Sequence, residues 1–184
     1  FARGDDVSAI ATLAEAARSP SADENIYALL IRQLAMRRIR VSDDGLLAAA
    51  AEIAADKSWP KTLAKFLLGK IDEEGLEALA TQTEKPSERS VRMCEMHFYV
   101  GMVRLISGDK STARLRLRSA VATNESALVE YTLTQAFLAA LETAQSPAAA
   151  VRKLVDPQLL RRGENGDSEA QWLIAETYRR QSER

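Results

Sequence analysis

The chain has 184 residues, of which 46% are hydrophobic and 28% charged, and its formal net charge is −1. This composition is typical of a folded domain with a buried core, and it excludes an overall field that would draw the chain to nucleic acid or an anionic membrane. One cysteine excludes an internal disulfide and a multi-cysteine zinc site, and no uncharged run approaches the roughly 18–20 residues of a membrane-spanning helix. The chain begins Phe-Ala-Arg-Gly-Asp-Asp without a methionine, which is typical of a fragment or a processed chain.

Apolar residues recur at spacings of three and four, and no stretch alternates with period two, so the sequence predicts an all-α protein. Ser, Asp or Asn with Pro or Gly interrupts this pattern at short intervals, as expected where one helix ends and another begins. The expected helices, in chain order, are 5–18, 24–38, 43–55, 59–69, 72–81, 88–107, 109–123, 126–143, 147–154, 157–163 and 168–182. Links this short make consecutive helices antiparallel neighbours, so we expect a series of helical hairpins.

Residues 96–122 fit the tetratricopeptide repeat, a helical pair with small and large residues at fixed positions. Gly101 falls where the two helices of the pair touch, and Gly108 with Asp109 makes the turn. The second helix carries small, large and small residues in the expected order: Ala113, Leu117 and Ala120. Three positions depart from the pattern, which makes the repeat degenerate: His97, Arg104 and Glu125 stand where Trp, Tyr and Pro would be.

Weaker echoes of this unit predict one tetratricopeptide-like α-solenoid domain over residues 1–184. Its helical pairs lie near 24–55, 59–81, 88–123 and 126–163, followed by an unpaired helix at 168–182. An unpaired terminal helix exposes apolar surface, so it needs a cap or a partner.

A more specific resemblance covers residues 59–141. Three motifs follow one another there: a Trp-led helix ending in Leu68-Gly69, the run FYVG followed by GD, and an AVA…VEY junction. This order resembles the C-terminal half of the bacterial outer-membrane tetratricopeptide lipoproteins of the NlpI type, and residues 166–178 resemble the first helix of a Sel1-like repeat. The resemblance implies an all-helical adaptor that brings envelope enzymes, notably peptidoglycan hydrolases and proteases, to their partners. It implies a place in the bacterial periplasm or cell envelope, although a cytoplasmic protein stays open.

Cys94 and His97 raise the question of catalysis, because residues three apart on a helix are neighbours and could form a nucleophile–base pair. No glycine-rich loop or oxyanion donor accompanies them, and His97 occupies a large-residue packing position of the repeat. A zinc ion needs three or four ligands, which Cys94, Glu95 and His97 could supply only by distorting one helix. We therefore expect no catalytic residue, no metal and no cofactor.

The charged clusters have structural explanations. The acidic pair Asp43-Asp44 and the acidic run 72–74 lie at helix starts, where carboxylates cap free N–H groups and favour the macrodipole. The arginines of 114–118 flank an apolar stripe on both sides, as in a solvated helix, and the near-zero net charge argues against a nucleic-acid surface.

The concave face is the expected binding surface, because the first helix of each tetratricopeptide pair lines it. The outward residues of these helices are Leu29, Arg32, Met36, Ile39, Arg40, Leu63, Phe66, Lys70, Glu95, Phe98, Met102 and Leu105. Methionine and aromatic side chains adapt to partner helices or peptides, and arginine binds carboxylates, so this set predicts a groove for a protein or peptide partner. The alternative is that neighbouring first helices pack directly on these residues and close the groove.

Three functions remain open from the sequence. The favoured one is a non-enzymatic scaffold or adaptor that binds a peptide, helix or protein partner. The second is a regulatory or targeting arm of a larger bacterial enzyme. The third is a solenoid that self-associates through the same helices, as a homo-oligomer.

Overall fold

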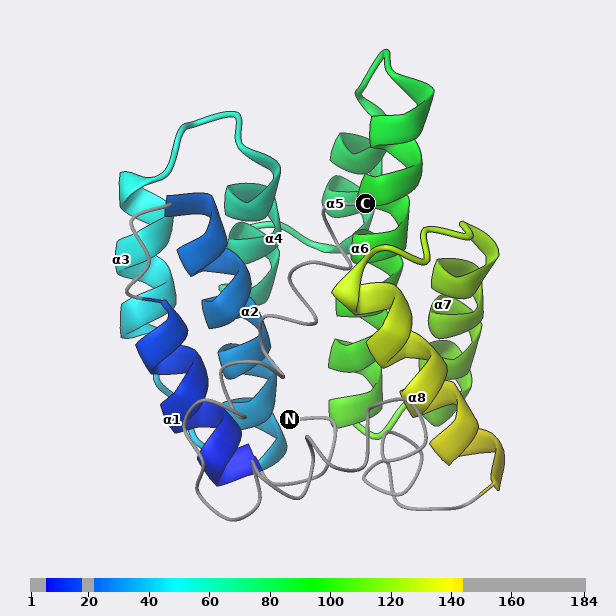
Figure 1. Cartoon of the computed structure of the whole chain (residues 1–184), viewed down its shortest axis with the longest axis horizontal. Helices are drawn as coiled ribbons and strands as arrows, with labels where there is room; N and C mark the ends of the chain where they lie inside the picture. Colours follow the sequence, from blue (N-terminus) through cyan, green and yellow to red (C-terminus); the bar gives the residue numbers. More distant parts are fainter. Residues whose placement is uncertain (1–5, 18–21, 144–184) are drawn as a thin grey trace.

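The computed structural model describes residues 6–17 and 22–143, and within these ranges the chain is all-helical, with eight helices and no strand (Figure 1). The helices are α1 (Asp6–Ala16), α2 (Ala22–Arg38), α3 (Gly45–Ile53), α4 (Trp59–Leu67), α5 (Glu73–Thr81), α6 (Pro86–Ile106), α7 (Lys110–Ala122) and α8 (Val129–Thr143). The all-α prediction is therefore confirmed for this part of the chain. The expected helices at 147–154, 157–163 and 168–182 lie outside the described residues.

Helix boundaries follow the capping chemistry of the sequence. The Asp72 carboxylate accepts the Gly75 N–H at 2.8 Å at the start of α5, and prolines occupy the first turns of α4 and α6. Proline in the first turn explains why α6 begins at residue 86, two residues before the expected start. At the end of α4, Gly69 adopts φ = 70° and Lys70 N–H donates to the Lys65 carbonyl at 2.8 Å, so the helix stops earlier than expected.

The helices pack both on their sequence neighbours and on alternate helices. Each odd-numbered helix from α3 to α7 contacts the helices before and after it, and α1 packs on α2. In addition, α2 contacts α4 and α6, α4 contacts α6, and α6 contacts α8. The four even-numbered helices thus form a connected set, with α8 packed on α6, which we call the inner layer. In Figure 1 the long helix α6 stands between α7 and α8 on one side and α1 to α4 on the other.

Gly101 is the contact point between α6 and α7. A Cβ atom on this residue would lie 2.9 Å from both Cγ and Cδ2 of Leu117 and 3.4 Å from Cβ of Arg116. Such distances are shorter than ordinary carbon–carbon contacts of about 3.5–4.0 Å, so only glycine lets the two helices approach this closely. The role predicted for Gly101 from the repeat pattern is confirmed.

Helix α4 is much shorter than its neighbours in the inner layer. It has nine residues, whereas α2 has 17 and α6 has 21. At a rise of 1.5 Å per residue α4 is about 13 Å long and α6 about 31 Å, so α4 separates α2 and α6 over only part of their length. Beyond the end of α4, at Leu67, the other two helices face each other directly.

None of the helices in the described ranges is long and apolar enough to cross a membrane. This finding agrees with the expected absence of a spanning segment in this part of the chain.

Candidate functional site

The structure places most of the predicted groove residues in the core. Eight of the twelve side chains are buried: Leu29, Arg32, Met36, Leu63, Phe66, Glu95, Phe98 and Met102. The other four lie at the edge of the layer, with Ile39, Arg40 and Lys70 exposed and Leu105 half-buried. Because α2, α4 and α6 pack directly on one another, the expected open apolar floor does not exist at the eight buried residues. At these eight residues the structure has the alternative arrangement, in which neighbouring helices pack on the predicted groove and close it.

Glu95 belongs to a buried polar cluster rather than to an exposed face. Its Oε2 atom accepts the Trp59 Nε1–H of α4 at 2.5 Å, and the Tyr27 hydroxyl of α2 also donates to this carboxyl group. Nearby, the Tyr99 hydroxyl donates to Glu130 Oε1 of α8 at 3.0 Å. Glu95 and Glu130 are 3% and 5% exposed. All four helices of the inner layer therefore contribute to one cluster, which we call the carboxyl cluster.

Sequence reasoning missed Glu130, although a signal was present. Glu130 precedes Leu133 by three residues, Thr134 by four and Phe137 by seven, so it shares a helix face with two apolar residues and one threonine. A carboxylate on such a face is buried if the face is buried. In the structure Thr134 lies beside it, and the Thr134 hydroxyl donates to the Glu130 carbonyl at 2.6 Å.

Burial dominates the electrostatics of the carboxyl cluster. It raises the pKa of Glu95 from an ordinary 4.5 to about 8, and the charge of Glu130 acts in the same direction. Hydrogen bonds from Tyr27 and Trp59 and the charge of Arg92 oppose this rise. Burial also raises the pKa of Glu130. Glu95 therefore holds its proton to a higher pH than an exposed glutamate does, and the pKa of Glu130 is shifted in the same direction.

The Cys94–His97 pair has the electrostatics of a packed core. Burial raises the pKa of the Cys94 thiol to about 12, so the thiolate that cysteine chemistry requires is scarce at neutral pH. Burial, followed by the charge of Arg116, lowers the pKa of His97. Its Nδ1 atom is buried without a hydrogen-bond partner among the described residues. The raised pKa of Cys94 disfavours the thiolate form that a nucleophile–base pair would use.

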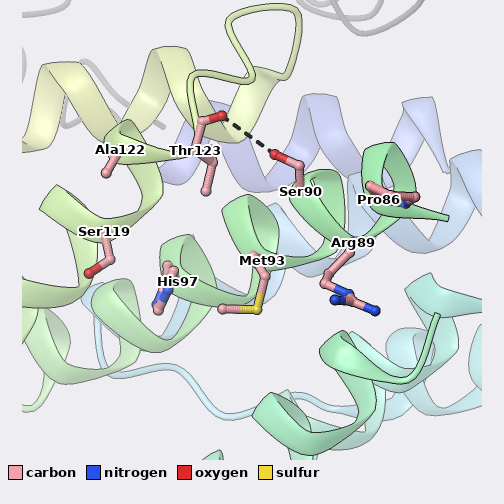
Figure 2. A pocket seen from close by; sticks show the side chains of 8 residues that line it. All are labelled: Pro86, Arg89, Ser90, Met93, His97, Ser119, Ala122 and Thr123. Carbon is pink, nitrogen blue, oxygen red and sulfur yellow. Dashed lines mark hydrogen bonds between the residues drawn. The ribbon is translucent and has the colours of Figure 1, made fainter. Parts of the chain in front are cut away.

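His97 does line a shallow hollow of about 400 Å³ between α6 and α7. Figure 2 shows Met93 and His97 on α6, with Ser119 on α7 and Thr123 directly after its end. The Ser90 hydroxyl donates to the Thr123 carbonyl at 3.4 Å across one end. Across the described part of the chain, no group of three or more His, Cys, Asp or Glu side chains could hold a metal ion.

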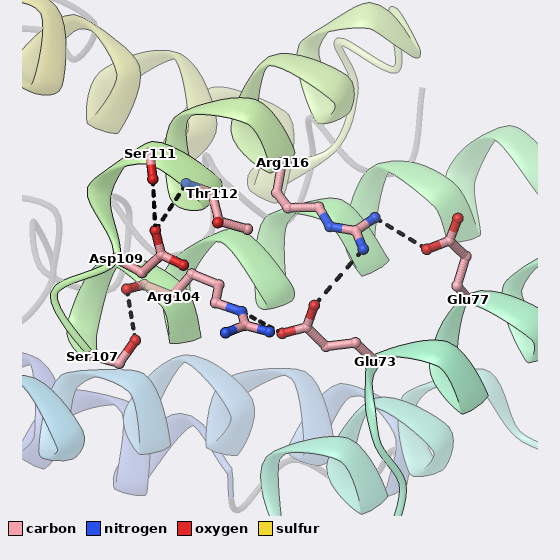
Figure 3. A network of polar contacts seen from close by, with 8 residues as sticks. All are labelled: Glu73, Glu77, Arg104, Ser107, Asp109, Ser111, Thr112 and Arg116. Atoms are coloured by element: carbon pink, nitrogen blue, oxygen red, sulfur yellow. Dashed lines mark hydrogen bonds and ion pairs between the residues drawn. The ribbon is translucent and has the colours of Figure 1, made fainter.

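Arg104 of α6 and the three arginines of α7 engage neighbouring helices. Arg104 Nε lies 2.6 Å from Glu73 Oε1, and Arg116 lies 3.7 Å from Glu73 Oε2 and 3.1 Å from Glu77 Oε2 (Figure 3). This network ties α5 to α6 and α7. The other two arginines of α7 bind a carbonyl and a carboxylate of α8. These guanidinium groups thus have protein partners, and Arg118 also keeps a largely exposed side chain, as expected for a solvated helix.

A second hollow of about 400 Å³ lies between the C-terminal ends of α2 and α6, beyond the end of α4. We call it the α2–α6 hollow. Its apolar wall consists of Val41, Val103 and Ile106, and its polar lining is Gln33, Arg37, Arg40, Ser42, Asp44 and Ser107. The Arg37 guanidinium donates to the Leu67 carbonyl, so this side chain joins the end of α4 to the hollow. Of the predicted groove residues, only Arg40 lines it.

The rim of the α2–α6 hollow has exposed apolar side chains and an unusual backbone. Val41, in the wall of the hollow, is 44% exposed, and Ile39, two residues earlier in the chain, is 39% exposed. Arg40 adopts φ = 60°, the left-handed conformation in which glycine is usual, at the end of α2. The Val41 N–H donates to the Met36 carbonyl at 2.9 Å and closes the helix end.

Comparison with known proteins gives no match: no protein-family model, no curated protein and no solved structure matches this chain.

Proposed function

We propose that this protein is a non-enzymatic scaffold that binds a peptide or helix of a protein partner, and that the partner enters the α2–α6 hollow. The observation that carries this proposal is the hollow itself, a recess with an apolar wall in which Val41 is exposed. Exposed apolar groups around a recess that also offers convergent polar side chains are typical of ligand and partner sites. A side chain of the partner would fill the recess, and the side chains of Arg37 and Arg40 would orient it.

We also propose that the helices form a tetratricopeptide-like solenoid. The contacts between alternate helices and the close approach of α6 and α7 at Gly101 support this arrangement. A more specific role, as an adaptor in the bacterial envelope, rests on the sequence resemblance of residues 59–141 alone.

A random 12-residue peptide library displayed on phage tests the binding function and does not require the partner to be identified first. Peptides enriched on the 184-residue chain would be labelled, and their binding measured by fluorescence anisotropy. The test variant is Val41→Asp, in the hollow, and the matched control is Leu115→Asp, on α7 at 65% exposure. Both positions are exposed enough to accept a carboxylate without unfolding, which circular dichroism would verify.

We expect Val41→Asp to weaken binding at least tenfold, about 1.4 kcal/mol, and Leu115→Asp to leave it unchanged. If no peptide is enriched, the scaffold function is rejected. If both variants bind as the native chain does, peptides bind elsewhere and the hollow is rejected as the site.

Self-association is a second candidate, and the outer face of α3 favours it. Leu46, Ala49 and Ile53 are exposed at spacings of three and four, and Ile53 is 81% exposed. Such an apolar stripe on one helix is suited to packing against a second copy. Sedimentation velocity at increasing concentration would test it: we expect association in the native chain and a monomer in Ile53→Asp. A native chain that stays monomeric at high concentration contradicts this candidate.

A further inference from the structure

We propose that Glu95 and Glu130 form a shared proton-binding site, and that its occupancy determines whether α8 stays docked on the inner layer. This goes beyond the scaffold function and does not depend on it. The inference begins from placement: two carboxyl groups from α6 and α8, neither more than 5% exposed, lie in one cluster closed by side chains of α2 and α4. Glutamate is rarely buried to this extent unless it is paired with a cation.

The hydrogen bonds of this cluster come from neutral donors. Glu95 accepts from the Trp59 indole and the Tyr27 hydroxyl, and Glu130 accepts from the Tyr99 hydroxyl. An ionised carboxylate has about four acceptor positions, so these donors satisfy only part of two charged groups. A proton held by one or both carboxyl groups removes this deficit.

The charged and titratable groups around the cluster do not supply the missing positive charge. They are, by element, Tyr27 from α2, Arg92, Cys94 and Tyr99 from α6, Glu125 from the connection between α7 and α8, and Glu130 from α8. α4 contributes the uncharged Trp59, and no charged side chain of α7 acts on either carboxyl group in the described structure.

Arg92 is the one cation in this set, and its charge is already shared. Its guanidinium forms an ion pair with Glu88 and lies 5.3 Å from the ring centroid of Trp59. Two carboxylates cannot both ionise beside one shared cation without leaving uncompensated charge in the core, which is strongly destabilising. The docked structure therefore retains a proton that a solvated pair would lose.

The position of Glu130 indicates which element responds when this proton leaves. Glu130 lies in the first turn of α8, which packs on the core through Leu133, Ala136 and Phe137. Outward movement of the start of α8 would bring the Glu130 carboxylate to water without disrupting α6, which is held on both sides by α5 and α7. Loss of the proton therefore favours release of α8 rather than unfolding of the whole chain.

Hydrogen exchange of the full chain measured by mass spectrometry tests this at pH 6 and at pH 8.5, after correction for the intrinsic pH dependence of exchange. In the native chain we expect protection of α8 amides to fall at least tenfold from pH 6 to pH 8.5, while protection of α6 and α7 amides stays within about twofold. The size follows because one linked proton changes an equilibrium by up to about tenfold per pH unit. Glu130→Gln should abolish the fall at α8. Glu142→Gln, an exposed carboxylate on the same helix, should retain it.

Two results would overturn the proposal: protection of α8 that does not change with pH in the native chain, or a fall of the same size in Glu130→Gln. Infrared titration of the native chain provides a measurement that needs no variant. We expect a carboxylic-acid carbonyl band that persists above pH 7. Its complete loss by pH 6 shows that no buried carboxyl group holds a proton and rejects the site even if Glu130→Gln fails to fold.

Discussion

Replacing Gly101 by alanine tests the packing of α6 on α7 most directly. The new Cβ would lie 2.9 Å from two atoms of Leu117, so between about 0.6 and 1 Å of overlap must be relieved. Both residues are buried, and Leu117 is fully enclosed, so little movement is available. Overpacking of a core costs about 1–3 kcal/mol, and we take the upper part of this range because the overlap involves Cγ as well as a terminal methyl group.

An opposing effect must be subtracted. Alanine is better than glycine inside a helix by about 1 kcal/mol. The free energy of unfolding should therefore fall by about 1–2 kcal/mol, which corresponds to a decrease in Tm of about 3–6 °C for a chain of this size. Urea denaturation followed by circular dichroism measures the change. Gly45→Ala is the control, because only Asp43 Oδ1, at 3.3 Å, lies near its Cβ position and the residue is exposed.

The sign of the effect should reverse when the obstruction is removed. In a Leu117→Ala background, which itself costs about 2–5 kcal/mol, Gly101→Ala should raise the free energy of unfolding by up to about 1 kcal/mol. A stabilising or neutral Gly101→Ala in the native background would refute the reasoning. So would the same sign in both backgrounds, because the two residues would then be uncoupled.

Three further predictions concern single residues. Asp109→Ala should lower the free energy of unfolding in urea melts, and Asp109→Asn should retain most of it, because the Asp109 side chain caps α7 through Thr112. The hydrogen bonds from Thr112 lower the pKa of Asp109. The contribution of the carboxylate is therefore present at neutral pH and is lost as the pH falls through the pKa of the folded state. Cys94 should react with a thiol reagent on the order of 1,000-fold more slowly in the native chain than in urea, since its pKa rises from 9.0 to about 12; equal rates would contradict its burial. Arg40→Gly should raise the free energy of unfolding by up to about 1 kcal/mol in thermal melts, because glycine adopts φ = 60° without the steric cost of a Cβ. A lower Tm would contradict this, because it would mean that the Arg40 side chain stabilises the fold by more than the backbone strain costs.

Most helix boundaries could be predicted because they depend on local chemistry. Pro86 fits only the first turn of a helix, and the side chains of Asp72 and Asp109 satisfy backbone N–H groups one turn later. These effects act within a few residues of sequence, so they are visible without any tertiary information. Gly101 was recognisable for a related reason: glycine within an apolar helical stripe indicates a close approach by another helix.

The predicted groove failed at Phe98 and Met102 because hydrophobic periodicity does not identify what covers a helix face. An apolar stripe facing a neighbouring helix and one facing a binding partner have the same sequence pattern. In this chain Phe98 and Met102 are fully buried in the core cluster that also contains side chains of α2 and α4. Helix α4 ends at Leu67, and the hollow lined by Arg40 lies beyond that end. The length of α4 was close to its prediction, but its effect on its neighbours depends on three-dimensional contacts.

The sequence by itself determined that the described part of this protein is all-helical, where most of its helices begin and end, and that α6 and α7 meet at Gly101. Only the tertiary structure decided which faces remain open and which charged groups lose water. Glu95 and Glu130 lie 35 positions apart in a chain whose pattern marks both as helical. Their pKa values depend on burial and on donors from three helices, α2, α4 and α6, and such long-range desolvation is not encoded in any local spacing.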